Sequence, residues 1–454
     1  MSMQSIDPTT GEAVEAFEEA SSAEVDRILA GAAAAFGRWR RVSFAERAAR
    51  MREAARLLRA KRSDYAAVMA REMGKPVTQG EAEVEKCAVG CDYYAEHAAR
   101  FLAEEPRDTD AARSYVRFDP LGPVLAVMPW NFPFWQVFRF AAPALMAGNA
   151  AILKHASNVP RCALEIEQLF RASGFPEGLF ATALVGARAV PALIADRRIR
   201  AVTLTGSERA GSEVAEVAGR ELKKTVLELG GSDPFIVLDD ADVGAAAKTA
   251  ADARLVNGGQ SCIAAKRFIV VDPIADRFLD RFVAEMQARK VGPPMDRDTA
   301  VGPLARHDLR DALHRQVEAS VHTGARLVLG GRIPSGPGAY YPPTVLADVG
   351  PGMPAFDEET FGPVAAVIRV RDETEAIRVA NGTSFGLGAS LWTTDRARAE
   401  RLAGEIEAGV VFVNDLVRSD PRLPFGGVKR SGYGRELSEF GIREFVNVKT
   451  VWIR

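Results

Sequence analysis

Residues 123–133 read PVLAVMPWNFP, and this stretch decides the fold. The apolar run from Val124 to Met128 is typical of a buried strand, and a polar turn with Trp130 and Asn131 follows it at once. Short strands that alternate with helices predict a parallel, doubly wound sheet, which binds ligands at the carboxyl ends of its strands. We therefore expect a nucleotide at this edge. Further strands of this sheet are predicted at residues 150–153, 181–185, 201–204 and 225–227.

The α/β pattern extends in both directions from this sheet. Residues 21–105 have a helical pattern, in which Ser43 and Glu46 form a capping box and Gly74 with Pro76 forms a stop signal. A second α/β pattern begins after Ser232. Its strands are predicted at residues 234–238, 268–271, 326–329, 364–368 and 410–413, and a helix at 373–381.

Two alternating segments, residues 114–118 and 445–452, stand apart from both sheets. Each is predicted to be a strand that leaves unpaired edges in a monomer. We therefore expect both segments at contacts between subunits.

Length and composition exclude several classes of protein. At 454 residues the chain exceeds one hydrophobic core, so two or three domains are expected. A 26% charged composition with a formal net charge of −2 argues against partners held by bulk charge, such as nucleic acid. The N-terminus has no signal pattern and no apolar run is long enough for a membrane span, so we expect a cytoplasmic location. Four cysteines and five scattered histidines predict neither a disulfide framework nor a metal site.

The first candidate for chemistry is Cys262, in the stretch NGGQSCIAAKR of residues 257–267. A thiol is nucleophilic only as its thiolate, and a glycine-rich turn lets backbone N–H groups approach a reacting centre and favour the anion. The predicted strand after Lys266 would anchor this turn. The alternative is a buried, inert cysteine in an ordinary loop.

Two strand-end residues are candidates for proton transfer and charge stabilisation. Glu228 ends an apolar strand before two glycines, so burial could raise its pKa into the range of a general base, unless it only caps the next turn. The side-chain amide of Asn131 could stabilise an oxyanion, unless it only fixes a turn. Gly206 and Ser207 open a helix that could bind a phosphate with its backbone N–H groups, unless they form only an ordinary strand-to-helix turn.

Taken together, these motifs resemble the NAD(P)-dependent aldehyde dehydrogenases over essentially the whole chain. The matching motifs are PWNFP at 129–133, KHAS at 154–157, TGS at 205–207, LELGG at 227–231, GQSC at 259–262, ETFGP at 359–363 and PFGGVKRSG at 424–432. The resemblance implies an α/β fold with a Rossmann-type cofactor domain, an α/β catalytic domain and a small β oligomerisation element. The expected boundaries are 1–111 and 121–230 for the NAD(P)-binding domain, 231–418 for the catalytic domain, 112–120 and 438–454 for the oligomerisation element, and 419–437 for a return segment to the cofactor domain.

The resemblance also implies a mechanism. The thiolate of Cys262 attacks the aldehyde carbon, and the Asn131 side chain and the Cys262 backbone N–H hold the oxyanion. Hydride passes to the nicotinamide, and Glu228 activates the water that hydrolyses the thioester. Lys154 and Ser157 would hold the adenine ribose, Gly206 and Ser207 the pyrophosphate, and Glu359 the nicotinamide ribose. The implied cofactor residues are Trp130, Lys154, His155, Ala156, Ser157, Gly206, Ser207, Leu229, Glu359 and Phe361.

One departure from the family pattern concerns the cofactor. Many NAD-preferring members have a glutamate where this chain has Ser157, and His155 replaces a more usual proline. A serine does not repel a 2′-phosphate and can donate to it. We therefore expect NADP, or use of both NADP and NAD.

Within the family the chain is most similar to the bacterial succinate-semialdehyde dehydrogenases, through KHASN at 154–158, GQSCIAAKR at 259–267 and KRSGYGREL at 429–437. Arg139 is expected to bind a substrate carboxylate, unless it faces solvent or an acidic neighbour. A second arginine found in some of these enzymes is Val256 here, and Ser419 could supply a hydroxyl instead. The other expected substrate residues are Phe132, Trp135 and Phe425.

Two alternatives to a succinate-semialdehyde dehydrogenase remain. One is an aldehyde dehydrogenase for another semialdehyde or for an aromatic or aliphatic aldehyde. The other is a non-catalytic binding or structural protein, against which Cys262, Glu228 and Asn131 argue because all three are intact. The expected partners are a small-molecule aldehyde and further copies of the chain, in a homodimer or homotetramer.

Overall fold

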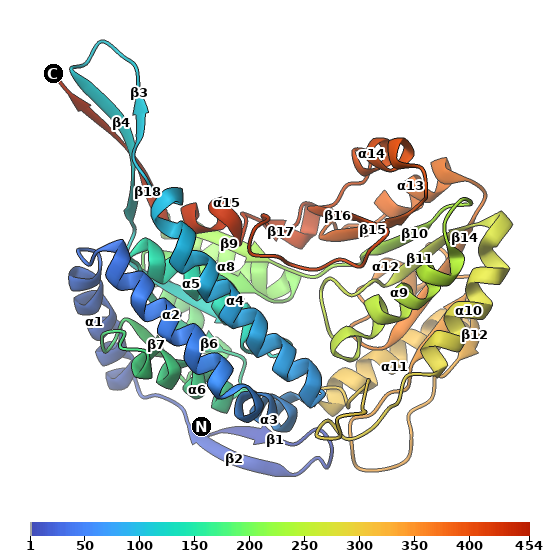
Figure 1. Ribbon diagram of the computed structural model, residues 1–454. Helices are drawn as coiled ribbons and strands as arrows, with labels where there is room; N and C mark the ends of the chain where they lie inside the picture. The colour runs from blue at the N-terminus through green and yellow to red at the C-terminus, as the bar shows by residue number, and fades with distance from the viewer. Residues whose placement is uncertain (1) are drawn as a thin grey trace.

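The predicted strand that opens the doubly wound pattern is β5 (Pro123–Met128), and it lies inside a six-stranded sheet. A computed structural model describes residues 2–454 of the chain (Figure 1). The strand order is β17-β9-β8-β5-β6-β7, and all pairs are parallel except β17 with β9. The other strands of this cofactor sheet are β6 (Ala150–His155), β7 (Phe180–Thr182), β8 (Ala201–Thr205), β9 (Lys224–Glu228) and β17 (Gly432–Tyr433).

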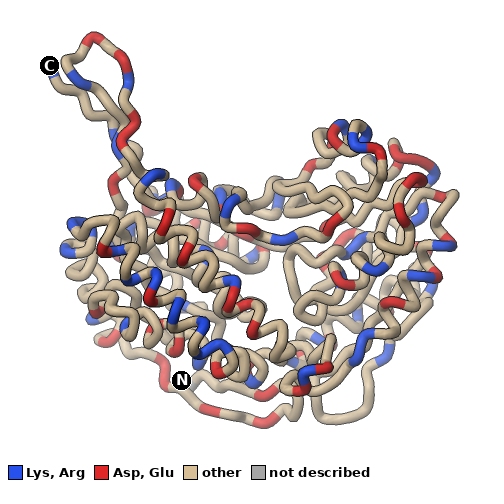
Figure 2. The backbone as a smooth tube through the Cα atoms, in the orientation of Figure 1, with Lys and Arg blue, Asp and Glu red and all other residues tan. Residues whose placement is uncertain are grey.

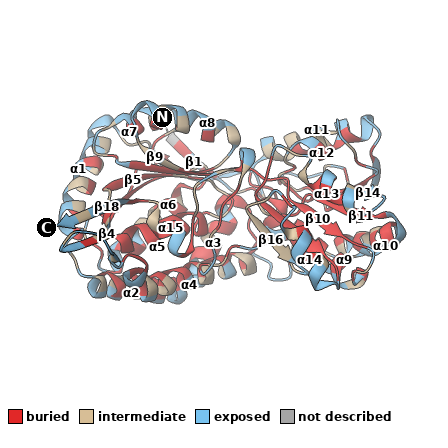
Figure 3. Cartoon of the chain, turned by 90° about the horizontal axis from the view of Figure 1, so that it is seen from above, coloured by how far each residue is buried: buried red, intermediate tan, exposed pale blue. Residues whose placement is uncertain are grey.

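Helices cover both faces of the cofactor sheet, as its almost wholly buried strands require. Seen from above, α7 and α8 lie on one face, and α2, α4 and α5 lie on the other (Figure 3). The helices of this half are α1 (Ser22–Trp39), α2 (Phe44–Ala60), α3 (Arg62–Met73), α4 (Val77–Phe101), α5 (Trp135–Ala147), α6 (Pro160–Ala172), α7 (Val190–Ala195), α8 (Glu208–Arg220) and α15 (Ser438–Arg443).

The helical signals of residues 21–105 are confirmed with one refinement. Ser43 and Glu46 form the predicted capping box at the start of α2, and Gly74 ends α3 in the left-handed conformation, with φ of 76°. Within this helical pattern the chain breaks at Lys61, where α2 ends and α3 begins.

The second α/β pattern forms a seven-stranded sheet of order β12-β13-β14-β11-β10-β15-β16, parallel except for β12. Its strands are β10 (Pro234–Val237), β11 (Arg267–Val271), β12 (Arg326–Leu329), β13 (Thr344–Ala347), β14 (Val364–Val370), β15 (Gly388–Trp392) and β16 (Val410–Val413). Its helices are α9 (Val243–Leu255), α10 (Ala275–Gln287), α11 (His307–His322), α12 (Pro354–Asp357), α13 (Glu373–Asn381) and α14 (Arg396–Ala403). Each main sheet has its own hydrophobic core.

The isolated segments form an arm that projects beside the C-terminus (Figure 1). β4 (Arg113–Pro120) lies between β18 (Val446–Ile453) and β3 (Glu105–Arg107) in an antiparallel sheet. The sequence predicted unpaired edges on both segments, but the tail pairs with 113–120 of its own chain. The free edges are therefore those of β18 and β3.

The remaining structure was missed from the sequence. β1 (Ser2–Ile6) and β2 (Ala13–Glu18) form a hairpin whose residues mix polar and apolar types, so their pattern is weak. β13 and β15 were also missed. Positive and negative side chains are interspersed over the molecule (Figure 2), as expected from a net charge near zero. Among residues 2–454, no helix is both long and apolar enough to cross a bilayer.

Candidate active site

The predicted site residues follow the strands of the cofactor sheet at one edge. Glu228 is the last residue of β9, Thr205 the last of β8 and His155 the last of β6, while Asn131 follows β5. Because these strands are parallel neighbours, their carboxyl ends lie together. The second sheet contributes the turn with Cys262, which precedes β11.

The turn before Cys262 requires glycine. Asn257, Gly258 and Gly259 have φ values of 53°, 63° and 76°, in the left-handed region. A Cβ atom on Gly259 would lie 2.2 Å from the backbone oxygen of Gly362. The backbone of this turn therefore packs directly on the ETFGP motif, which explains why the two motifs occur in one chain.

Hydrogen bonds join the Asn131 loop to the Cys262 loop. The Asn131 side-chain amide donates to the Gln260 carbonyl at 3.1 Å, and the Asn257 amide donates to the Asn131 carbonyl at 2.7 Å. Asn131 is 4% exposed, and only one of its two amide hydrogens has this acceptor. The second hydrogen is available for an oxyanion. Asn257, which orients Asn131, was not singled out from the sequence.

The environment of Cys262 differs from the expectation of a thiolate. Burial raises the pKa of the Cys262 thiol to about 12, although the positive charges of Arg139 and Lys266 lower it. Lys266 donates to the backbone carbonyls of Cys262 and Ser261, at 2.7 and 2.9 Å. The thiol is therefore protonated at neutral pH in this structure, and a base must remove its proton before attack.

Glu228 has the environment expected of a general base. It is 2% exposed, and burial raises the pKa of its carboxyl to about 8, with Arg139 acting in the opposite direction and Glu436 in the same one. Its Oε1 atom has no hydrogen-bond partner among residues 2–454. A carboxyl with a pKa near neutrality can accept a proton from a thiol or a water molecule.

Arg139 is engaged by acidic residues. Its Nε atom forms an ion pair with Glu436, and Nη2 lies 3.9 Å from Glu228 and 3.4 Å from Thr205 Oγ1. The guanidinium, 2% exposed, also lies over the Phe425 ring at 4.7 Å. This geometry favours the acidic-neighbour alternative, because a substrate carboxylate would have to compete with Glu436.

Two of the other expected substrate residues lie around a cavity of about 460 Å³. Phe132 and Trp135 line it. The Trp135 indole N–H donates to Ser419 Oγ at 3.1 Å, so Ser419 lies beside the same wall. Lys86 of α4, which the sequence did not single out, also lines this cavity.

The expected adenosine residues surround a second cavity, of about 670 Å³. Trp130, Lys154, Ala156 and Ser157 line it together. Among residues 2–454, no carboxylate forms an ion pair with the Lys154 ammonium, although its side chain is buried. The donor set of a buried, unpaired ammonium and a serine hydroxyl fits ribose and phosphate oxygens.

His155 differs from the expectation of a cofactor contact. Its Nε2 donates to the Pro133 carbonyl at 2.9 Å, and Nδ1 accepts from the Ala156 N–H at 2.9 Å. Burial lowers the pKa of this imidazole to about 4, so it stays neutral. Both ring nitrogens are used to fix the turn after Asn131, and the side chain has none left for the cofactor.

The remaining cofactor candidates lie at the opening of α8 and on the ETFGP motif. Ser207 caps α8, with its hydroxyl accepting from the Ala210 N–H at 3.3 Å, and Gly206 precedes it. A Cβ on Gly211 of α8 would meet Leu229 at 2.6 Å. The N-terminus of this helix can bind a phosphate.

Glu359 and Phe361 of the ETFGP motif contact residues of the LELGG and PWNFP motifs. Glu359 accepts from the Gly231 N–H at 3.0 Å and lies 3.5 Å from the Lys266 ammonium. The ring of Phe361 meets Trp130 edge-to-face, with centroids 5.8 Å apart. Both side chains therefore lie where the two halves of the molecule meet.

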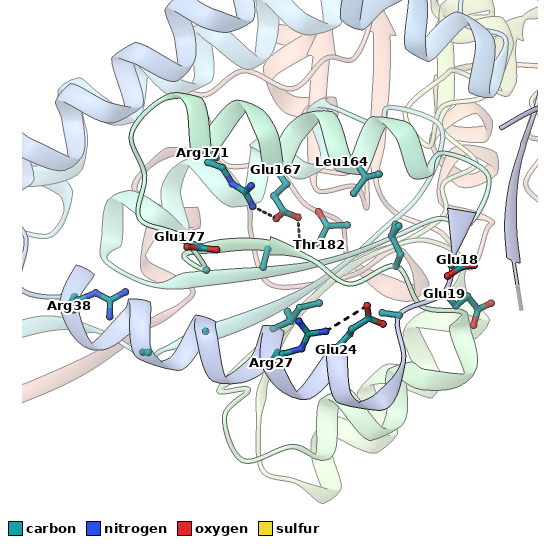
Figure 4. Close-up of a pocket in the computed structure, with 17 residues that line it drawn as sticks. Glu18, Glu19, Glu24, Arg27, Arg38, Leu164, Glu167, Arg171, Glu177 and Thr182 are labelled. Carbon is teal, nitrogen blue, oxygen red and sulfur yellow. Dashed lines mark hydrogen bonds and ion pairs between the residues drawn. The ribbon is translucent and has the colours of Figure 1, made fainter. Parts of the chain in front are cut away.

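A further cavity, also of about 670 Å³, lies between α1, α6 and β7 (Figure 4). Its walls carry both charges, with Arg27 3.7 Å from Glu24 and Arg171 3.3 Å from Glu167. It contains none of the predicted site residues, so it is separate from the active site.

A cysteine, a buried glutamate and an asparagine with a free amide hydrogen, beside a doubly wound sheet, are the groups that an enzyme with a cysteine nucleophile needs. The sequence model of the aldehyde dehydrogenase family matches residues 1–451, and the chain belongs to this family.

Relatives support this assignment over the full length. A probable succinate-semialdehyde dehydrogenase [NADP(+)] of Synechocystis sp. is 53% identical, with 100% of both chains covered. The succinate-semialdehyde dehydrogenase [NADP(+)] of Mycobacterium avium is 54% identical, with coverage of 100% of this chain and 97% of the relative. The solved structure of succinic semialdehyde dehydrogenase from Streptococcus pyogenes in complex with NADP+ is 40% identical, with a TM-score of 0.97 and 99% of each chain covered. The chain therefore has the aldehyde dehydrogenase fold and is an enzyme that oxidises an aldehyde to an acid.

Proposed function

We propose that the protein oxidises succinate semialdehyde to succinate with NADP. The observation that carries the proposal is the 53% identity over the whole chain to a relative named for this reaction. The active site agrees with it, because Cys262, Glu228 and Asn131 are intact and Ser419 lies beside an apolar cavity large enough for a four-carbon aldehyde.

The mechanism follows from the positions of these side chains. The negative charge of Glu228 raises the pKa of the Cys262 thiol, and we assign to this carboxylate the removal of the thiol proton, directly or through water. Sulfur then bonds to the aldehyde carbon, and the free amide hydrogen of Asn131 binds the oxyanion together with the Cys262 backbone N–H. The chemistry that NADP supplies when bound is acceptance of a hydride, which leaves a thioester on Cys262.

Hydrolysis of the thioester is assigned to Glu228. A water molecule attacks the thioester carbon while Glu228 accepts its proton, and the thiol leaves as the acid is released. Because the pKa of Glu228 is about 8, the fraction of active base rises as pH increases through this value. Glu228 is also poorly solvated, which strengthens it as a base.

The preference for NADP is assigned to Lys154 and Ser157. Their side chains line one cavity, whose wall also includes Glu19 and Asp308, and position 157 itself has a serine where a carboxylate would repel a 2′-phosphate. A 2′-phosphate would gain charge-assisted hydrogen bonds from the ammonium and the hydroxyl. The relatives from Synechocystis and Mycobacterium avium are named for NADP+.

The direct test is a set of kcat/KM values for succinate semialdehyde, glutarate semialdehyde, butyraldehyde and benzaldehyde, each with NADP and with NAD. The proposal expects the largest value for succinate semialdehyde with NADP. A larger value for an uncharged aldehyde, or for NAD, would contradict it.

Assembly as a homodimer or homotetramer is part of the same proposal, with the arm of β3, β4 and β18 at a contact between subunits. The support is its exposed apolar side chains, because Val448, Trp452 and Ile453 are 61%, 49% and 45% exposed. Light scattering that gives the mass of a monomer at micromolar concentration would refute it. The cytoplasmic location expected from the sequence stays a prediction.

A further inference from the structure

Lys86 of α4 is a partly buried cation without an acidic partner. Its ammonium donates to Ser419 Oγ at 2.8 Å and lies 4.6 Å from the centroid of the Trp135 ring. In residues 2–454, no aspartate or glutamate forms an ion pair with it, although 43 such pairs occur elsewhere. Cations that leave solvent are usually paired, so an uncompensated one on a cavity wall is a candidate anion site.

The hydroxyl of Ser419 also indicates an anion site beside Lys86. Its oxygen accepts from both Lys86 and the Trp135 indole N–H, and the side chain is 6% exposed. A hydroxyl that accepts twice keeps its own hydrogen to donate, and no acceptor for it is present in residues 2–454. Lys86 likewise has ammonium hydrogens left over. The two groups are donors without an anion.

The acidic residues nearby are already neutralised. Glu83 pairs with Lys75 and accepts from the backbone N–H groups of Phe134 and Trp135, at 2.9 Å each. Asp420 pairs with Arg422 at 2.6 Å. Neither carboxylate therefore serves as the counter-ion of Lys86.

The cavity beside Lys86 is lined by two residues that are close to the reacting groups in the chain. Phe132, directly after Asn131, and Val256, at the start of the turn before Cys262, both line it. Leu255 and Leu416 are apolar parts of the remaining wall, which also carries the charged side chains of Glu83, Asp252 and Arg289. An aliphatic chain packs against such a wall, while an anionic end needs the cation.

We propose that Lys86, together with the Ser419 hydroxyl, binds the carboxylate of the substrate. This inference rests on the proposed function and names the charged group that selects a semialdehyde over an uncharged aldehyde. It assigns to Lys86 the role that the sequence analysis expected of Arg139, whose charge is compensated by Glu436.

The titration of Lys86 makes the proposal sensitive to pH. Burial, together with the charge of Arg139 on α5, lowers the pKa of Lys86 to about 8, although Cys87, Glu83 and Asp420 act in the opposite direction. As pH rises through this value the ammonium loses its proton and the carboxylate loses its partner. The KM for succinate semialdehyde should therefore increase above about pH 8, whereas the KM for butyraldehyde should not.

The experiment compares Lys86→Met with the wild type on succinate semialdehyde and butyraldehyde at saturating NADP. Methionine keeps most of the side-chain length without the charge. Loss of a charge-assisted hydrogen bond predicts a fall of about ten- to a hundredfold in kcat/KM for succinate semialdehyde, mostly through KM. Activity on butyraldehyde should change by no more than about twofold, and Lys86→Arg should restore the preference.

Arg289→Met is the matched control. Arg289 lines the same cavity, but its guanidinium is paired with Asp252 at 2.7 Å, so its removal should leave the ratio of the two substrates unchanged. An equal loss on both substrates in Lys86→Met, an unaltered pH dependence of KM, or the same shift in Arg289→Met would overturn the assignment to Lys86. A wild type without any preference for succinate semialdehyde would instead refute the proposed function.

Discussion

The cofactor side and the substrate side of this active site are built in different ways. The cofactor side consists of residues at or just after the ends of strands in one parallel sheet, such as Lys154 near the end of β6 and Ser207 after β8. The substrate side joins segments that are distant in the chain, since Lys86 contacts Ser419 across 333 positions. One parallel sheet therefore positions the first side, whereas packing between helices and loops positions the second.

Cys262 lies where the two sides meet, and its removal has the largest expected effect. Cys262→Ala should abolish aldehyde oxidation, with a loss on the order of a thousandfold or more in kcat, because no other nucleophile is available. Binding of NADP, measured by fluorescence titration, should stay within about twofold of the wild type because the cofactor side is independent. Steady turnover by this variant would refute the mechanism.

Arg139→Leu tests whether the arginine belongs to the substrate side at all. Removing it leaves Glu436 and Glu228 buried without their cation, which should cost about 3–5 kcal/mol in the free energy of unfolding. The pKa of Glu228 should also rise above its present value of about 8, so the increase of kcat with pH should occur at a higher pH. Thermal unfolding and a pH profile measure the two effects.

The two substrates distinguish the roles of this arginine. If Arg139 is structural, activity falls equally on succinate semialdehyde and on butyraldehyde. Arg139→Lys, which keeps a charge, is the matched variant. A loss of activity on succinate semialdehyde alone would show that Arg139 binds the substrate carboxylate.

Ser157→Glu should produce a smaller change, confined to the cofactor side. A carboxylate facing the 2′-phosphate of NADP should raise the KM for NADP by about tenfold or more, while it can accept from the 2′-hydroxyl of NAD. Ser157→Ala, which removes the hydroxyl without adding charge, is the control. Equal effects on NADP and NAD would place Ser157 away from the ribose.

The sequence predicted the two α/β sheets because short strand patterns and strand-end turns are local signals. The same signals located Glu228 and Cys262, and burial does raise the pKa of Glu228 as expected. Lys86 was not predicted as a site residue, because a lysine on an amphipathic helix is expected to face solvent. Only the folded structure brings Ser419 and Trp135 against it. Glu436 was also missed, because it lies outside the helices and its ion pair with Arg139 joins residues far apart in the chain. The sequence therefore could not decide whether Arg139 has an acidic neighbour.

His155 and the C-terminal tail show the other limit of local patterns. The histidine follows a strand like the cofactor residues, but both of its ring nitrogens bind backbone groups. The tail alternates like an edge strand, and its partner, β4, lies more than three hundred residues earlier in the same chain. Neither contact could be derived from spacing, because each depends on the folded path of the backbone.

The most direct test of the central claim uses Glu228→Gln mixed with succinate semialdehyde and NADP. Without the base for hydrolysis, one equivalent of NADPH should form, though more slowly than in the wild type because Glu228 also takes the thiol proton, and turnover should then stall. Mass spectrometry of the peptide that contains Cys262 should show an added succinyl group, held as a thioester and released by hydroxylamine. An unmodified Cys262 after NADPH has formed would contradict the account.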